Sequence, residues 1–185
     1  MISNADVDVP ALRTELVGVK VSLRPFTAGD ITEAYLGWLR DQEVVRFSNQ
    51  RFVDHTVESC QAYLASFSST ANQFLAVCDR DTGEMFGTIT VYRNLHHRTA
   101  DVGIMVGERK VWGQGIGAEA FCLVLSALEC SGQIRKITAG TLSVNHGMVQ
   151  IMKKAKMHHE ATRKGQELFE GVPVDVVYYA TFCDD

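Results

Sequence analysis

A glycine-punctuated segment near the middle of the chain carries the clearest chemical signal. It reads VWGQGIGAEAF, with Gly113, Gly115 and Gly117 in alternate positions. The segment lies between an expected strand and an expected helix. Glycine lets the backbone turn tightly and approach a ligand, and the first N–H groups of a helix are unpaired at the positive end of its dipole. These features predict an anion site suited to a pyrophosphate.

The spacing of this segment differs from that of the familiar nucleotide motifs. There is no G-x-x-x-x-G-K-[ST], which disfavours a P-loop ATPase. Ala118 follows Gly117, so G-x-G-x-x-G is absent, as is the acidic residue expected about 20 positions further on in a dinucleotide-binding fold. A G-x-S-x-G elbow, an i,i+4 histidine pair and a C-x-x-C pair are also missing. The sequence therefore predicts neither a hydrolase elbow nor a metal site.

Length, composition and charge limit the classes of protein to which the chain can belong. The chain has 185 residues, of which 46% are hydrophobic, and a formal net charge of −4. This length suits a single domain, and the charge does not suggest a nucleic-acid partner. No apolar run approaches the ~20 residues that span a bilayer, and the acidic N-terminus is unlike a signal peptide. The 5 cysteines are scattered and odd in number. We expect a cytoplasmic protein without a membrane partner.

The elements that must position the glycine-rich segment follow from the hydrophobic pattern. Alternation of Val19, Val21 and Leu23 predicts a strand, and apolar spacing within Asp30–Arg40 predicts a helix face. The expected helices are Asp30–Arg40, Val57–Phe67, 115–131 and 145–156. The further expected strands are Gln73–Cys78, Met85–Tyr92, Ala100–Val106, Lys136–Leu142, 159–163 and Val174–Phe182, the last two joined by a loop containing Gly165, Gly171 and Pro173.

This order of elements predicts the fold class. Hairpins in the first half argue against an all-parallel sheet, and crossover helices in the second half argue against a pure β fold. We expect an α/β (mixed α+β) domain whose central sheet is mixed and largely antiparallel, with helices on both faces. Residues 1–17 are expected to be a flexible N-terminal tail, and residues 18–185 a single domain.

Three segments resemble the GNAT superfamily of acyl-CoA N-acyltransferases. VWGQGIGAEAF is similar to its phosphate-binding motif, Gln/Arg-x-x-Gly-x-Gly/Ala, with Gly115 and Gly117 on the last two positions and Trp112 on the first. SVNHGMVQIMKKAKM resembles the family's Asn-x-x-Ser/Ala…Gly-Phe segment, with Asn145 on the asparagine. AYLGWLRDQEVVRF resembles a W-L-x-D-x-x-V signature of the branch that includes ribosomal-protein N-terminal and nucleotide-amino-sugar acetyltransferases.

The resemblance implies a GNAT fold and acetyl-CoA as cosubstrate. The pyrophosphate would sit on the N–H groups from Gln114 to Ala118, the pantetheine arm would run beside 103–106, and a backbone N–H near Met105 or Val106 would polarise the thioester carbonyl. Asn145 would line the other side of the cleft. The expected cofactor-binding residues are Ile104, Met105, Val106, Lys110, Val111, Trp112, Gly113, Gln114, Gly115, Ile116, Gly117, Ala118 and Asn145.

Transfer to an amine needs a neutral nucleophile, so a base or a proton path must act at pH 7. Asp101 is the first candidate because alternation places it on the same strand face as Gly103 and Met105. The other catalytic candidates are Glu43, His97 and, as a substitute acid, Tyr179. Many family members carry a tyrosine seven residues after the asparagine, and here that position holds Met152.

The resemblance leaves the amine acceptor open. The W-L-x-D signature favours a nucleotide-linked amino sugar, and the alternatives are a protein N-terminus, a polyamine or an antibiotic amine. The partner is thus a small-molecule or peptide amine, and because family members are often dimers a homodimer is a further expectation. A non-catalytic acyl-CoA sensor is the rival from another class, favoured by Met152 and by Lys156-Met157 where the family has Gly-Phe.

Overall fold

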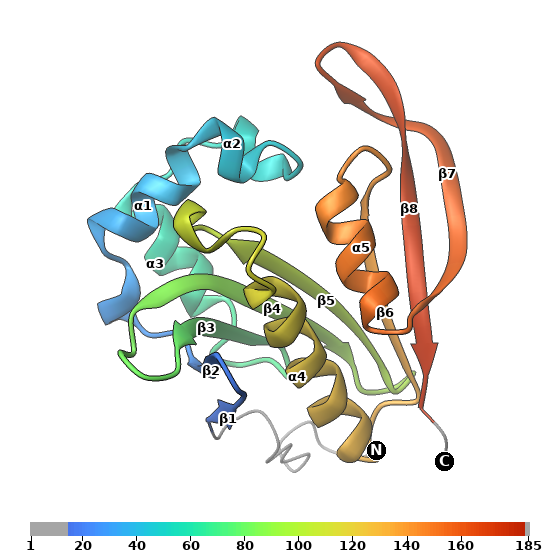
Figure 1. Cartoon of the computed structure of the whole chain (residues 1–185), viewed down its shortest axis with the longest axis horizontal. Helices are drawn as coiled ribbons and strands as arrows, with labels where there is room; N and C mark the ends of the chain where they lie inside the picture. The colour runs from blue at the N-terminus through green and yellow to red at the C-terminus, as the bar shows by residue number, and fades with distance from the viewer. Residues whose placement is uncertain (1–14, 184–185) are drawn as a thin grey trace.

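The computed structural model describes residues 15–183, which form one mixed sheet flanked by helices (Figure 1). The strand order is β1-β2-β3-β4-β5-β6-β8-β7, and within it only β5 and β6 pair in parallel. The strands are β1 (Leu16–Val17), β2 (Val21–Pro25), β3 (Gln73–Asp79), β4 (Met85–Asn94), β5 (Thr99–Val106), β6 (Lys136–Leu142), β7 (His158–Phe169) and β8 (Val172–Phe182). The expected fold class is confirmed.

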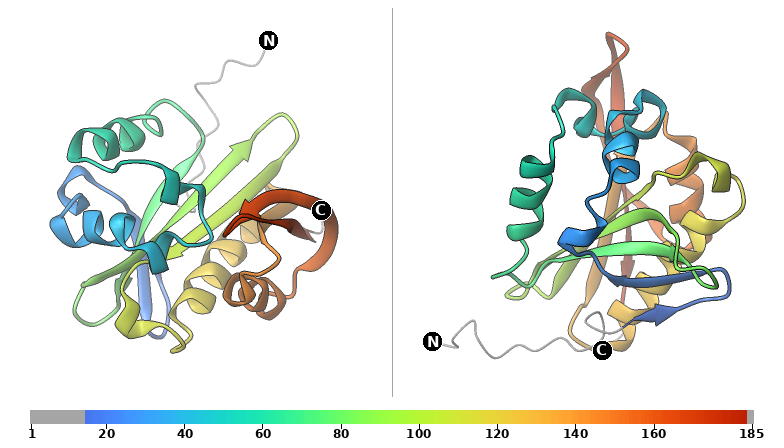
Figure 2. Two further views of the ribbon diagram at one scale, coloured as in Figure 1. Left: turned by 90° about the horizontal axis from the view of Figure 1, so that it is seen from above. Right: turned by 90° about the vertical axis from the view of Figure 1, so that its left-hand side faces the viewer.

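Helices cover both faces of this sheet (Figure 2). One face carries α1 (Glu33–Arg40), α2 (Gln42–Val45) and α3 (Val57–Ala65), together with the 3-10 turns η2 (Ala28–Asp30) and η3 (Asn49–Phe52). The other face carries α4 (Ile116–Cys130) and α5 (His146–Lys154), and the turn η4 (Arg109–Val111) leads into α4. No helix within residues 15–183 has the length and apolar character needed to cross a membrane.

Each face has its own apolar core. Beneath α4, Phe121, Val124 and Leu128 are fully buried against the sheet. Beneath α1 and α3, Leu36 and Phe74 belong to a second, smaller cluster that is rich in aromatic side chains. Burial of such side chains contributes roughly 1.5–3 kcal/mol each to folding. The sheet is therefore held between two layers, which makes it a rigid frame for any site along its middle strands.

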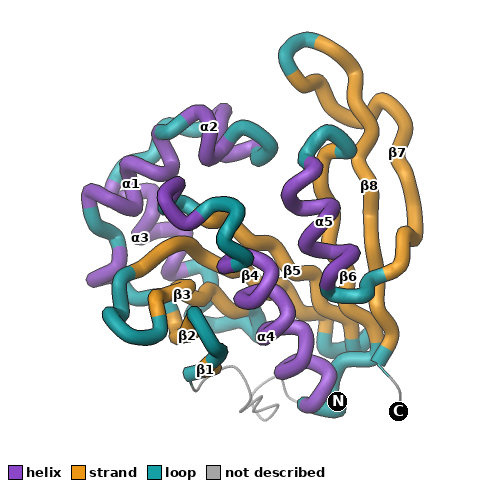
Figure 3. Tube along the Cα trace, in the orientation of Figure 1, coloured by secondary structure: helices purple, strands orange, loops and turns teal. Residues whose placement is uncertain are grey.

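β5 and β6, the strands expected to flank the cofactor cleft, stay together over only part of their length. These two strands pair only where Thr99, Ala100 and Asp101 meet the first three residues of β6. β6 then pairs with β8 along its whole length, and β5 with β4. The strands separate beyond Asp101 (Figure 3). Within the described residues, the edge of β5 that faces β6 therefore has no strand partner from Val102 onward.

Two expectations about boundaries were wrong. Leu16–Val17, expected in the tail, form β1, where Leu16 lies opposite Leu23; residues 1–14 of the expected tail lie outside the described residues. The loop expected between the last two strands is a continuous hairpin, which turns at Glu170 and Gly171, both with positive φ. Both faces of that hairpin tip are largely exposed, so its residues carry no alternating hydrophobic signal.

Candidate active site

The glycine-rich segment forms the N-terminus of α4, as its sequence predicts. Gly113 and Gly115 have φ values of 76° and 85°, a left-handed region that disfavours any side chain. Gly115 is the N-cap residue and offers no side chain to the turn. Helix geometry leaves the N–H groups of Ile116, Gly117 and Ala118 without intrahelical acceptors. The segment thus presents bare amides at the positive end of a 15-residue helix.

Gly117 brings this helix end close to the cleft. A Cβ atom there would lie 3.1 Å from Cγ2 of Val106 and 3.2 Å from Cδ1 of Ile151. The first residue is at the end of β5 and the second is on α5, so the three elements meet at this glycine. Its lack of a side chain sets how closely the amide groups approach the open edge of β5.

The residues next to these glycines make different contacts. The indole Nε1 of Trp112 donates a hydrogen bond to the carbonyl of Val106 at 2.8 Å, which fixes the turn that follows β5. The side-chain amide of Gln114 donates to the carbonyl of Lys110 at 2.7 Å. Val111 packs against the main core. The Lys110 side chain remains 83% exposed, so it can extend toward a phosphate.

β5 and the start of α5 carry the residues expected on the two walls of the cleft. Ile104, Met105 and Val106 form the unpaired end of β5. At the start of α5, the side-chain oxygen Oδ1 of Asn145 accepts a hydrogen bond from the backbone amide of Met148 at 3.2 Å, which caps α5. The side-chain nitrogen Nδ2 of Asn145 donates to Oγ1 of Thr141 at 3.0 Å and so ties the cap to β6. The expected cofactor-binding residues thus lie at the end of β5, at the start of α4 and at the start of α5.

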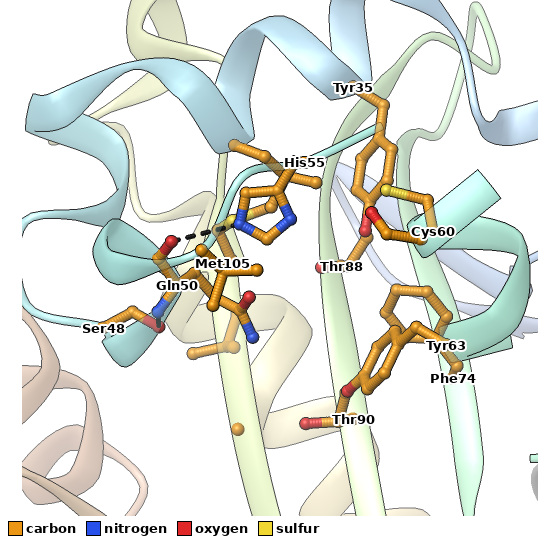
Figure 4. A pocket seen from close by; sticks show the side chains of 15 residues that line it. Tyr35, Ser48, Gln50, His55, Cys60, Tyr63, Phe74, Thr88, Thr90 and Met105 are labelled. Carbon is orange, nitrogen blue, oxygen red and sulfur yellow. Dashed lines mark hydrogen bonds between the residues drawn. The ribbon is translucent and has the colours of Figure 1, made fainter. Parts of the chain in front are cut away.

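A pocket of about 330 Å3 lies on the other face of the same stretch of β5 (Figure 4). It is enclosed by β4 and β5 together with α1, α3 and the η3 segment. Figure 4 shows Tyr35, Cys60 and Thr88 on one side and His55 near Met105 on the other. The lining residues are Tyr35, Leu39, Ser48, Gln50, Val53, His55, Ser59, Cys60, Tyr63, Phe74, Thr88, Thr90, Gly103, Ile104 and Met105.

Hydrogen bonds and burial fix the polar groups of this pocket. Nε2 of His55 lies 3.1 Å from the carbonyl oxygen of Gln50, which orients the ring. Burial raises the pKa of Tyr35, and burial together with the hydrogen bond to Tyr92 raises the pKa of Tyr63. Both phenols therefore stay protonated at neutral pH. The Tyr63 and Tyr92 hydroxyl oxygens are 2.7 Å apart.

Asp101 lies where β5 and β6 begin to separate. It shares a strand face with Gly103 and Met105, both of which line the pocket. The Thr138 hydroxyl donates a hydrogen bond to Oδ2 of Asp101 at 2.6 Å. Desolvation raises the pKa of this carboxyl, and the Thr138 hydrogen bond opposes that rise. A carboxylate with a raised pKa is a stronger base, which suits proton abstraction near neutrality.

The other catalytic candidates lie elsewhere. Glu43 is in the first turn of α2, exposed, and 3.9 Å from Arg46. His97 is in the exposed turn between β4 and β5, at the end of β5 opposite to the cleft. Tyr179 is 7% exposed within the main core and packs edge to face on His159. Met152 is also fully buried. The structure does not bring these side chains to the pocket lining.

Sequence reasoning missed most of the pocket. The sequence patterns did not single out His55, Tyr63, Thr88 or Thr90, and Tyr35, which belongs to the apolar helix face expected within Asp30–Arg40, is buried. These residues come from α1, α3, β4 and the loop before α3, and none belongs to a spaced motif. One pattern in the sequence could have indicated a polar pocket wall: Thr88 and Thr90 alternate on one face of an otherwise apolar strand.

Comparisons with known proteins agree with this geometry. A family model described as the acetyltransferase (GNAT) domain matches residues 20–158. The solved structure of a GNAT-family acetyltransferase from Bacillus anthracis is 19% identical, with a TM-score of 0.79 over 93% of this chain and 100% of its own. No curated protein matches the chain by sequence.

Two further solved structures share the fold and contain the cofactor. RimL, a ribosomal-protein alpha-N-acetyltransferase in complex with coenzyme A, is 15% identical, with a TM-score of 0.80 over 92% of this chain and 99% of its own. The spermidine N-acetyltransferase from Vibrio cholerae, in complex with CoA and spermine, is 15% identical, with a TM-score of 0.77 over 89% and 96%. The chain belongs to the GNAT family of acetyltransferases, which use acetyl-CoA as the acetyl donor.

Proposed function

We propose that this protein transfers the acetyl group of acetyl-CoA directly to a primary amine within a ternary complex. One observation carries the proposal: the stretch of β5 that lines the pocket, Gly103–Met105, also belongs to the unpaired edge of β5 beside the start of α4. A thioester lying along that edge and an amine in the pocket would then meet at the unpaired edge of β5. Holding two reactants in contact replaces a collision in solution and lowers the barrier substantially.

The cofactor would be held mainly by backbone groups. Its pyrophosphate would accept hydrogen bonds from the amides of Ile116, Gly117 and Ala118, and Lys110 would add a positive charge. The pantetheine arm would lie along the unpaired edge of β5. A backbone N–H near Met105 or Val106 would donate to the thioester oxygen as negative charge develops there.

Asp101 would remove the proton from the attacking amine, directly or through water. The amine must lose this proton because an ammonium group has no lone pair for attack on the thioester carbon. Asp101 is supported by its strand face, its raised pKa and its hydrogen bond from Thr138. Attack forms a tetrahedral adduct whose nitrogen still carries an extra proton. The C–S bond then breaks, and the departing CoA thiolate takes up that proton, directly or through water, so that CoA leaves as the thiol. The bond can break without a strong acid because thiols, with a pKa of about 8.5, are far more acidic than alcohols or amines.

The acceptor is best described as a primary amine of small size. The nucleotide-linked amino sugar suggested by the W-L-x-D signature gains no support from the pocket, since no Lys or Arg lines it among the described residues to neutralise a diphosphate. RimL and the spermidine acetyltransferase are named for very different amines. Their shared fold therefore does not choose between acceptor classes.

Initial-rate kinetics with acetyl-CoA and a panel of amines tests the proposal. CoA release that depends on the amine, with intersecting double-reciprocal lines, is expected for direct transfer in a ternary complex. Parallel lines would instead indicate an acetyl-enzyme intermediate and contradict direct transfer. Binding of acetyl-CoA without turnover of any amine would favour the acyl-CoA sensor.

A further inference from the structure

We infer that the acceptor is an aromatic monoamine, in which a single amino group is attached to an uncharged ring-bearing body. The inference deepens the proposed function and rests on it, because it concerns the pocket that faces the thioester. Three features of this pocket support it: the charge of its lining, the aromatic side chains in its wall, and the contacts that join the two halves of the molecule beside it.

The lining of the pocket carries no carboxylate and no Lys or Arg in the part of the chain that the structure describes. Asp101 is the nearest acidic residue along β5, and its proposed task is to serve the reacting amine. A diamine or polyamine would bury a second ammonium group with no acidic partner. An unpaired buried charge costs several kcal/mol, so the pocket disfavours such acceptors.

Aromatic side chains form much of the wall. Tyr35, Tyr63 and Phe74 line the pocket, and Phe74 lies 5.4 Å from the Tyr63 ring centroid in an edge-to-face arrangement. Ring ligands gain from offset or edge-to-face contact with such walls. The Tyr35 and Thr88 hydroxyl groups belong to the lining of the pocket. They can therefore meet a polar substituent on the ring.

A bridge beside the pocket joins the helical half of the molecule to the β7–β8 hairpin. Phe47 stacks on Phe169 at 5.3 Å between centroids, and Arg46 pairs with Glu170 at 2.8 Å. Arg51 also donates to the carbonyl of Leu168 at 3.3 Å. These contacts adjoin Ser48 and Gln50 in the lining. The bridge would obstruct a bulky polypeptide on this side of the pocket, which favours a small acceptor.

The test compares kcat/KM for phenethylamine, hexylamine, spermidine and an N-terminal alanine peptide at saturating acetyl-CoA, with acetylated products separated by chromatography. We expect phenethylamine to exceed spermidine and the peptide by at least about tenfold, because neither competitor can pair its extra charge or polar backbone in the pocket. The kcat/KM for hexylamine should be lower than that for phenethylamine, because hexylamine has no ring to contact the aromatic wall.

A charge-insertion variant gives the matched test. Ser59→Glu places a carboxylate in the lining at the third residue of α3, a position that favours glutamate after the Thr56 N-cap. It should raise kcat/KM for spermidine several-fold relative to phenethylamine. Gln61→Glu adds the same charge to the same helix at an exposed position outside the lining, and it should leave the ratio unchanged.

The outcomes separate the two proposals. Preference for spermidine or the peptide would overturn the aromatic monoamine and leave direct acetyl transfer intact. If no amine is acetylated, the proposed function fails. In that case calorimetry on the CoA-bound protein tests the aromatic-monoamine inference separately. Tighter binding of phenethylamine than of spermidine would support the inference. No binding of phenethylamine, or equal binding of both amines, would refute it.

Discussion

Asp101 and Thr138 face each other at the point where β5 and β6 begin to separate, and their hydrogen bond tunes the proton affinity of the candidate base. Desolvation raises the pKa of the carboxyl, so the folded protein holds this proton more tightly than the unfolded chain does. The contribution of this group to folding stability therefore falls as pH rises through the raised pKa. A residue that costs stability when ionised is characteristic of a functional site.

Replacement of the candidate base separates catalysis from folding. Asp101→Asn should lower kcat/KM by about a hundredfold, because general-base catalysis typically contributes 10²–10⁴-fold. The melting temperature at neutral pH should stay level or rise, because the variant has no carboxylate to ionise in a desolvated place. Rate assays and thermal melts check this. An active variant with wild-type kcat/KM would eliminate Asp101 as the base.

Thr138 should act on the rate only through Asp101. Thr138→Val removes the hydrogen bond that lowers the pKa of Asp101, so that pKa should rise further. The acidic limb of the kcat/KM profile should then move to higher pH, while the plateau rate at high pH stays close to that of the parent. A uniform loss of rate without a shift of the limb would point to a structural role for Thr138.

At the scale of single elements, α4 carries the proposed cofactor site, and Gly117 lets the start of α4 lie close to Val106 at the end of β5. The helix is held in register by Glu119, whose carboxylate accepts hydrogen bonds from the amides of Val19 and Lys20. Its core face, which includes Phe121 and Leu128, is fully buried. A helix fixed at both its first turn and its apolar face can present amide groups without reorganisation on binding.

A matched pair of glycine substitutions tests this placement. Gly117→Ala introduces a Cβ atom 3.1 Å from Val106 and should weaken acetyl-CoA binding measured by calorimetry. Gly37→Ala, within α1, meets no atom within 4 Å and should leave binding unchanged. It should also raise the unfolding free energy by about 0.5–1 kcal/mol, because alanine favours the helical state. Equal effects of the two changes on binding would contradict the role given to Gly117.

At the scale of the whole molecule, the tip of the β7–β8 hairpin contacts the α2–η3 segment, which also contributes Ser48 and Gln50 to the pocket. Phe169 and Glu170 at this tip are more than a hundred residues away from Phe47 and Arg46 in sequence. The guanidinium of Arg46 also lies 5.2 Å from the Phe169 ring centroid. The segment beside the proposed acceptor pocket is therefore held by residues from the far end of the chain.

Breaking this contact should change acceptor use rather than cofactor use. Arg46→Ala and Glu170→Ala should each raise KM for the amine, and the double variant should resemble either single one because both remove the same pair. The affinity for acetyl-CoA should not change. High salt should reduce the difference in KM for the amine between the parent protein and the variants, because the Arg46–Glu170 ion pair is exposed and salt screens it. Additive effects of the two substitutions would show that the residues act independently.

Local patterns in the sequence were sufficient to predict β5 and the start of α4. The alternation around Asp101, Gly103 and Met105 assigned their strand face correctly, and the glycine spacing located the start of α4. The same reasoning failed at 164–173, where an exposed hairpin has no buried face to impose a period of two. It also missed β1 (Leu16–Val17), because a two-residue strand leaves almost no pattern.

The sequence by itself determined the fold class, the glycine-rich start of α4 and the family, because each depends on residues that are neighbours along the chain. Only the tertiary structure decided which side chains line the pocket proposed for the acceptor, including Tyr35, His55 and Thr88. That pocket is assembled from separate elements by packing against both faces of the sheet. Its uncharged lining is therefore a property of long-range contacts and has no counterpart in any local motif.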